Sequence, residues 1–119
     1  MTLKNTMDDY SLITRKIVLP AHLNHHDTLF APQMAYWHVE ASFLCMCRIV
    51  KKPSQVFCLK VLDFLMTKPI QPGEMVELRC QLVKVGRTSA VIYTDVVSLS
   101  TGETAAHGGV KFVTAENGE

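Results

Sequence analysis

One carboxylate, Glu40, stands in a long and mostly apolar stretch, residues 34–46. A carboxylate among buried apolar side chains is costly unless it is paired or used in chemistry. In such a place it can act as a general base or a nucleophile, with a pKa tuned by burial and by His38, two positions earlier. The alternative is a structural acid that reaches a polar edge or pairs with an arginine or lysine. Residue type alone leaves both readings open.

A polar segment precedes that stretch and carries His22, Asn24, His25, His26 and Asp27. Histidine is the commonest ligand of borderline metals, so a metal site is one reading of His-x-x-His-His. Adjacent histidines seldom hold one ion, however, and the sequence brings no cysteine or paired carboxylate to them. We therefore predict no metal and favour a polar loop that caps the next helix and lines a site.

Residues 32–48 are predicted to form one helix, because Pro32 suits a first helical turn and nothing breaks the pattern after it. Apolar or small residues fall on every face, which predicts a helix buried on all sides. The backbone N–H groups around Ala31 and Gln33 could hold a carbonyl oxygen or an oxyanion. Glu40 lies about 12 Å further along the helix, too far for both groups to hold one carbonyl within one chain. If both groups act on one carbonyl, one chain must supply the helix start and a partner chain must supply the carboxylate.

The turn Gly86-Arg87-Thr88-Ser89 combines a glycine, a cation and two hydroxyl groups. This turn can bind phosphate, or it can be a plain hairpin turn with a solvated arginine, and the sequence favours neither interpretation. No glycine-rich phosphate loop, dinucleotide fingerprint or serine nucleophile motif is present.

Alternating and apolar runs predict strands at residues 11–19, 56–66, 74–85, 89–99 and 104–113. The run at 56–66 is apolar enough to be buried on much of both faces. The run at 74–85 alternates, with Val76, Leu78, Cys80 and Leu82 facing inward and Glu77, Arg79 and Gln81 facing water. Short turns in the second half predict an antiparallel meander. The fold class is therefore α+β, in one domain spanning residues 1–119, with a sheet that curls around the helix or a second chain that covers it.

Composition excludes several functions. The formal net charge is +1 over 119 residues, which gives no support to nucleic-acid binding. The helix is too short and too polar for a membrane span, and residues 1–10 lack the apolar core of a signal peptide. The four cysteines lie in apolar runs without zinc-ligand spacing, which predicts free, buried thiols and a cytoplasmic location.

The segments around the helix start resemble the hotdog-fold acyl-CoA thioesterases. In that family an asparagine, a Thr-Leu-Phe run and a small pair lead into the central helix, as Asn24, Thr28-Leu29-Phe30 and Ala31 do here. The resemblance extends over about residues 13–114 and includes Lys68-Pro69-Ile70, Pro72-Gly73-Glu74, Val85-Gly86-Arg87-Thr88-Ser89 and the closing Gly108-Gly109-Val110-Lys111-Phe112-Val113.

The resemblance implies a curved antiparallel sheet wrapped round the long helix, paired edge to edge into a homodimer that assembles into a tetramer or hexamer. It implies sites between the chains that hydrolyse acyl-CoA to free acid and CoA, with no cofactor apart from the substrate's own CoA. By match, the backbone of Ala31 and Gln33 polarises the thioester carbonyl, and Glu40 is the base or nucleophile. Asn24 positions the water or the other chain's carboxylate. Arg87, Thr88 and Ser89 lie near the CoA phosphates.

The chain departs from the family pattern in two places. Pro32 occupies a position that is commonly glycine and has no N–H to donate. The acid often falls one residue earlier, at Val39 here, and one step rotates a side chain by about 100° around a helix. These departures keep two alternatives open. One is a hotdog dehydratase or hydratase that uses His25 or His26, and the other is a non-catalytic acyl-CoA-binding protein.

Overall fold

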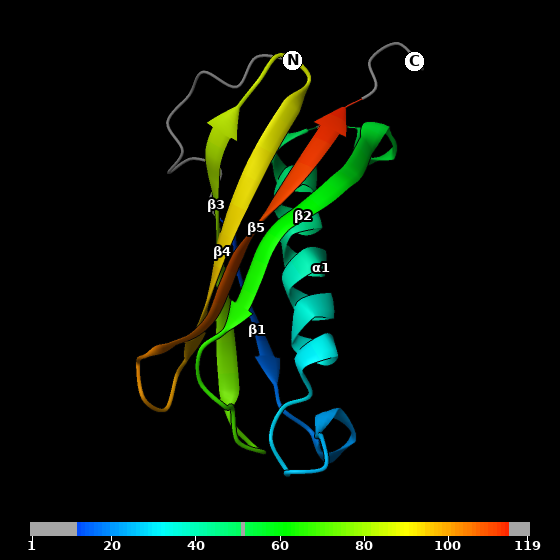
Figure 1. Cartoon of the computed structure of the whole chain (residues 1–119). Helices are drawn as coiled ribbons and strands as arrows, with labels where there is room; N and C mark the ends of the chain where they lie inside the picture. The colour runs from blue at the N-terminus through cyan, green and yellow to red at the C-terminus, as the bar shows by residue number, and fades with distance from the viewer. Residues whose placement is uncertain (1–11, 51, 115–119) are drawn as a thin grey trace.

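The computed structural model describes residues 12–50 and 52–114, and its elements are labelled in Figure 1. The chain runs through β1 (Leu12–Ile17), α1 (Ala31–Ile49), β2 (Val56–Met66), β3 (Met75–Val85), β4 (Ser89–Ser98) and β5 (Thr104–Thr114), with 3₁₀ helices at Pro20–His22 and Pro53–Gln55. The predicted order of one strand, one long helix and four strands is confirmed. Ser11 and the polar residues 1–10 lie outside the described residues.

The sheet has five antiparallel strands in the order β1-β3-β4-β5-β2. The predicted meander is right for β3, β4 and β5 but wrong for β2, which pairs with β5 and not with its sequence neighbour β3. The connection from β2 to β3 crosses the end of the sheet and is anchored there by Ile70. That side chain is fully buried, and its carbonyl accepts a hydrogen bond from the Leu29 N–H at 2.8 Å.

Register shifts bend the sheet. Two occur in β2, between Cys58 and Lys60 and between Val61 and Asp63, and one occurs in β3 between Leu82 and Lys84. Each inserts an extra residue, which raises the local twist and bends the strand. Figure 1 shows the result: the strands lie on one side of α1, and β2 curves along it.

The core lies between α1 and the inner face of the sheet. The predicted inward set of β3 is confirmed, since Val76, Leu78, Cys80 and Leu82 are at most 2% exposed. Arg79 and Gln81 face water as predicted, but Glu77 is buried. Its carboxylate accepts hydrogen bonds from Arg15 at 2.9 Å and Arg79 at 2.8 Å, so the two guanidinium groups cover it and hold its pKa below the ordinary value.

The helix is not buried on all sides, contrary to the prediction. Met34, Trp37, Ala41 and Cys45 face the sheet, whereas Tyr36 is 62% and Leu44 is 45% exposed. One sheet can cover only one side of a helix. The apolar character of the opposite side therefore reflects something other than the core of this chain.

Strand β2 departs from its prediction in the same way. It forms an edge of the sheet, and most of its side chains are exposed, with Phe57 at 52% and Leu59 at 55%. Cys58 is exposed too, so the expected burial of all four cysteines is wrong, although none of the four forms a disulfide. The apolar composition of this strand is not explained by packing within one chain.

Candidate active site

Asn24 organises the loop that leads into the helix. Its Oδ1 accepts hydrogen bonds from the backbone N–H groups of His26 at 2.8 Å and Thr28 at 3.1 Å, and its Nδ2 donates to Thr28 Oγ1 at 3.0 Å. Asp27 takes the left-handed conformation, φ 60°, that this tight turn requires. Leu29 is buried and pairs with Leu23 across the turn. The loop is therefore a built structure that fixes the entry to α1.

The helix start leaves one backbone donor free. Gln33 N–H already bonds the Phe30 carbonyl at 3.0 Å, and Pro32 has no N–H. Among the described residues the Ala31 N–H has no acceptor. Of the two positions that the resemblance indicated, Ala31 is thus the one with an N–H available to a carbonyl oxygen.

Glu40 is neither deeply buried nor unpaired. Its carboxylate lies 3.2 Å from the Lys16 ammonium on β1, and its side chain is 35% exposed. Of the two readings that the sequence left open, pairing with a lysine is observed. The carboxylate remains accessible from outside the chain, so the pairing does not remove it from chemistry.

His38 does not lie beside Glu40, contrary to the sequence reading. Two residues along a helix turn a side chain by about 200°, which sends the two groups to opposite sides. Glu40 reaches β1 at one edge of the sheet, whereas the fully buried His38 ring lies 5.1 Å from the ring of Phe64 on β2, at the other edge. Among the described residues neither ring nitrogen has a hydrogen-bond partner. Burial lowers the pKa of His38, so the ring is held neutral.

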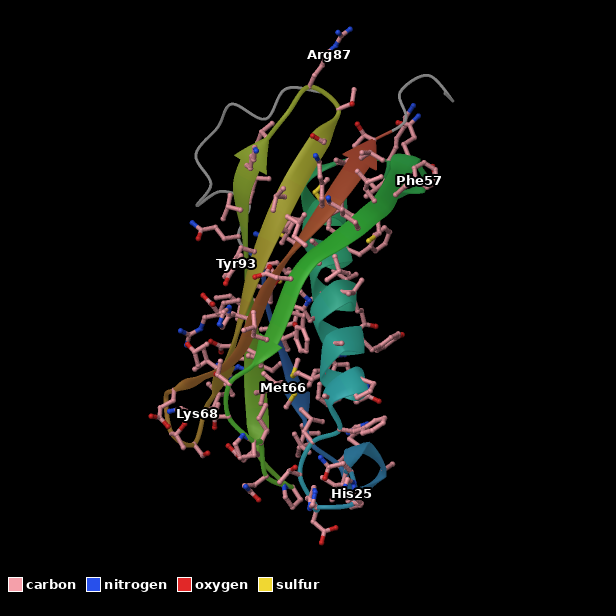
Figure 2. The ribbon with its side chains drawn as sticks, in the orientation of Figure 1. His25, Phe57, Met66, Lys68, Arg87 and Tyr93 are labelled. Carbon is pink, nitrogen blue, oxygen red and sulfur yellow. The ribbon has the colours of Figure 1, made fainter. Side chains whose placement is uncertain are left out.

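Arg87 and Thr88 lie in the turn between β3 and β4, Ser89 begins β4, and all three lie far from the helix start. Figure 2 shows Arg87 at one end of the molecule, pointing outward, and His25 of the polar loop at the other. The chain measures 47 Å along its long axis. One chain therefore brings Asn24, Ala31 and Gln33 together at one end, and it places Arg87, Thr88 and Ser89 at the opposite end.

A sequence model of the Thioesterase superfamily matches residues 62–105, from β2 to the start of β5. No curated protein sequence matches the chain. Among solved structures, an acyl-CoA hydrolase from Staphylococcus aureus, described in complex with butyryl coenzyme A, superposes with a TM-score of 0.85 at 19% identity over 93% of this chain and 66% of that one. A protein described as a hexameric acyl-CoA thioesterase superposes with a TM-score of 0.86 at 23% identity, over 97% and 76% of the two chains. The chain has the hotdog fold.

The resemblance noted in the sequence is thus confirmed at the level of the fold. A third hotdog structure, the phenylacetic acid degradation protein PaaI from Thermus thermophilus, superposes with a TM-score of 0.79 at 20% identity over 89% and 86% of the two chains. The chain spans just under two thirds of the length of the S. aureus hydrolase. No helix among the described residues is long and apolar enough to cross a membrane.

From the sequence alone, Thr28 is given no role of its own, and Lys16 is not named as part of the site. Thr28 holds the Asn24 amide, and Lys16 holds the Glu40 carboxylate. Thr28 could have been found from its spacing, because an asparagine side chain often bonds residues shortly after it in a turn. Lys16 carried no such signal, since its pairing depends on how β1 lies against α1.

Proposed function

We propose that the protein is an acyl-CoA thioesterase that hydrolyses acyl-CoA to free acid and CoA in a site shared between two copies of the chain. The match to the Thioesterase superfamily on a hotdog fold carries this proposal. The organised loop at the helix start supports it, because that loop fixes Asn24 and leads directly to Ala31, whose backbone N–H has no acceptor among the described residues.

The shared site follows from the separation of the groups. The helix start and Arg87 lie at opposite ends of the molecule, and in the part of the chain that the structure describes β2 has one unpaired edge. Unpaired edges are commonly covered or paired. Pairing two β2 strands antiparallel about a two-fold axis sets the Arg87 end of one copy beside the helix-start end of the other. A tetramer or hexamer of such dimers is part of the proposal.

Each group has a role in this arrangement. The Ala31 N–H polarises the thioester carbonyl, and Glu40 of the other copy acts as general base or nucleophile. Asn24 positions the attacking water or that carboxylate. Arg87, Thr88 and Ser89 bind the CoA phosphates. Four cysteines without a disulfide favour a reducing compartment, which we propose to be the cytoplasm.

A non-catalytic acyl-CoA-binding protein is the second candidate, and two observations favour it. The Glu40 carboxylate pairs with Lys16 on β1, at the edge of the sheet opposite the β2 edge that we propose to pair. Variants of the S. aureus hydrolase have been made at an asparagine and at an aspartate that follows it by fifteen positions. Fifteen positions after Asn24 this chain has Val39, and Glu40 follows one position later.

Thiol release from a series of saturated acyl-CoA esters of increasing chain length tests the proposal. A thioesterase releases free thiol from some of them, whereas a binder retains them intact. A hydratase or dehydratase that uses His25 or His26 has no double bond to act on in these substrates. Binding without thiol release across the whole series would overturn the catalytic proposal.

Mixing two inactive variants tests whether the site is shared. Glu40→Gln removes the carboxylate, and Asn24→Asp removes the amide donor while keeping the oxygen that accepts the loop N–H bonds. Random reassortment places both changes in one site of a heterodimer and leaves the other site intact, so about a quarter of native activity should return. A mixture that stays inactive while refolded wild type recovers would show that each site is built within one chain.

A further inference from the structure

Three lysines stand in one row across the outer face of the sheet. Lys60 on β2 pairs in register with Lys111 on β5, Lys111 pairs with Val91 on β4, and Val91 pairs with Lys84 on β3. Their neighbours along each strand, such as Ile92 and Phe112, face the core, so the row faces away from α1. The sheet's hydrogen-bonding register thus gathers three ammonium groups from distant parts of the sequence.

The row borders a hollow of about 420 Å³. Its other lining residues include the apolar Leu62, Val83 and Val91, together with Ser89 at the start of β4. Leu62 and Val83 are the extra residues at two of the register shifts, so the same irregularities that bend the sheet shape this hollow. It is therefore a cationic depression with an apolar floor.

Folding does not explain the row. Like charges directly opposite on neighbouring strands are destabilising, and Lys60 faces Lys111. Among the described residues none of the three lysines takes part in an ion pair, whereas Lys16 and Lys68 both do. Three unpaired ammonium groups beside an apolar floor suit a ligand that carries several negative charges and a flat or apolar portion.

We infer that the row Lys60, Lys111 and Lys84 binds the phosphate groups of the nucleotide end of a CoA ester, an inference that rests on the proposed function. Strands lie about 4.8 Å apart, so Lys60 and Lys111 are one spacing apart and Lys84 is two spacings further on. That spread matches a ligand with phosphates at separate positions, as CoA has on its 3′ and 5′ oxygens. The hollow beside the row is also lined by Gly86 and Ser89, which flank the Arg87 turn, so the row and Arg87 are placed to serve one end of the ligand.

Adenosine 3′,5′-bisphosphate tests the row directly, because it lacks the thioester and its binding needs no catalysis. Titration calorimetry on the full chain should show binding that weakens as salt is raised. Lys111→Gln should weaken it about tenfold or more, the effect of losing one charge-assisted hydrogen bond. Lys111→Arg keeps the charge and should retain binding. Lys68→Gln removes the same charge at a remote site and should leave the affinity unchanged.

The same variants also test whether the protein still folds and whether the site prefers the CoA nucleotide to other nucleotides. Lys111→Gln should melt at or above the wild-type temperature, because it relieves the repulsion with Lys60. If it fails to fold, Lys84→Gln repeats the test without a lysine directly opposite. The proposed site would be wrong if wild type and Lys111→Gln bound adenosine 3′,5′-bisphosphate with equal affinity. It would also be wrong if Lys68→Gln lost as much affinity as Lys111→Gln. ATP binding as tightly as adenosine 3′,5′-bisphosphate would overturn the assignment to CoA.

Activity separates this inference from the proposed function. Lys111→Gln should raise KM for acyl-CoA and leave kcat unchanged, because the contact is equal in the ground and transition states. Thiol release with an unchanged KM in Lys111→Gln would support the thioesterase proposal and contradict binding by the lysine row. Bisphosphate binding that depends on the lysine row, without thiol release from any ester, would support the binding site and contradict the thioesterase proposal.

Discussion

Adjacent glycines on β5 should respond oppositely to the same substitution. A Cβ added at Gly108 would lie 2.2 Å from the Asp63 carbonyl oxygen and 2.9 Å from the Phe64 Cα, both backbone atoms of β2. A Cβ added at Gly109 would lie 3.5 Å from its nearest neighbour, a side-chain oxygen of Asp63. The first contact is impossible without moving a strand, and the second is an ordinary van der Waals contact.

The size of each change in the free energy of unfolding depends on which neighbouring atoms must move to admit the methyl group. Overpacking a core by one methyl group costs about 1–3 kcal/mol when side chains can shift. At Gly108 the neighbours are backbone, so β2 must separate from β5, the one strand it pairs with among the described residues, and lose ladder hydrogen bonds. We expect Gly108→Ala to lower the free energy of unfolding by about 3 kcal/mol or more and the melting temperature by about 10 °C. Gly109→Ala should be neutral or stabilising by about 0.5 kcal/mol, because alanine reduces the entropy of the unfolded chain.

Urea unfolding followed by circular dichroism measures both variants against wild type. The slope with denaturant must stay constant for the comparison, since a changed slope reports a change in the exposed surface. Gly108→Ala within about 0.5 kcal/mol of wild type would refute the close approach of β2 to β5, as would a larger loss in Gly109→Ala. If Gly108→Ala does not fold while Gly109→Ala does, the reasoning holds.

Three further predictions concern the site and the assembly. Glu40→Gln should lower thiol release by about 100-fold or more with an unchanged melting temperature, and near-native turnover would mean that another group is the base. The neutral, buried His38 has a pKa below its unfolded value of 6.5, so the unfolded chain binds the extra proton first and stability should fall as pH drops below 6.5. The loss is at most about 1.4 kcal/mol per pH unit for one proton, and His38→Leu should flatten that part of the profile, as urea unfolding at several pH values would reveal. Sedimentation at micromolar concentration should show a species at least twice 13.3 kDa, and a solely monomeric protein would exclude edge pairing.

The sequence predicts the elements well because their signals are local. Pro32 marks the helix start, and the alternation at Val76, Leu78 and Cys80 sets the inner face of β3. These patterns depend on spacing along one strand or helix, and the structure confirms them. The position of β2 depends instead on which strands pair, and a short connection from β2 to β3 suggested the wrong neighbour.

The candidate site is predictable only in part, for the same reason. Asn24 and Ala31 belong to one continuous segment, so their closeness follows from the sequence. The Lys16 partner of Glu40 and the row that joins Lys60 to Lys111 depend on register and on the packing of α1. The placing of His38 beside Glu40 failed because nearness in sequence is not nearness around a helix.

The unexpected exposure of α1 and β2 and the separation of the site residues within one chain have one physical explanation. Tyr36 and Leu44 on α1, and Phe57 and Leu59 on β2, are apolar residues that one chain leaves about half exposed or more. Exposed apolar side chains beside an unpaired strand edge are the features that a second copy covers. In the proposed dimer, a second copy paired antiparallel along β2 would carry its own Arg87 end toward the Asn24 end of the first. Of the two covers that the sequence leaves open for the helix, the sheet covers only one side, and we infer that a second copy covers the apolar residues that remain exposed.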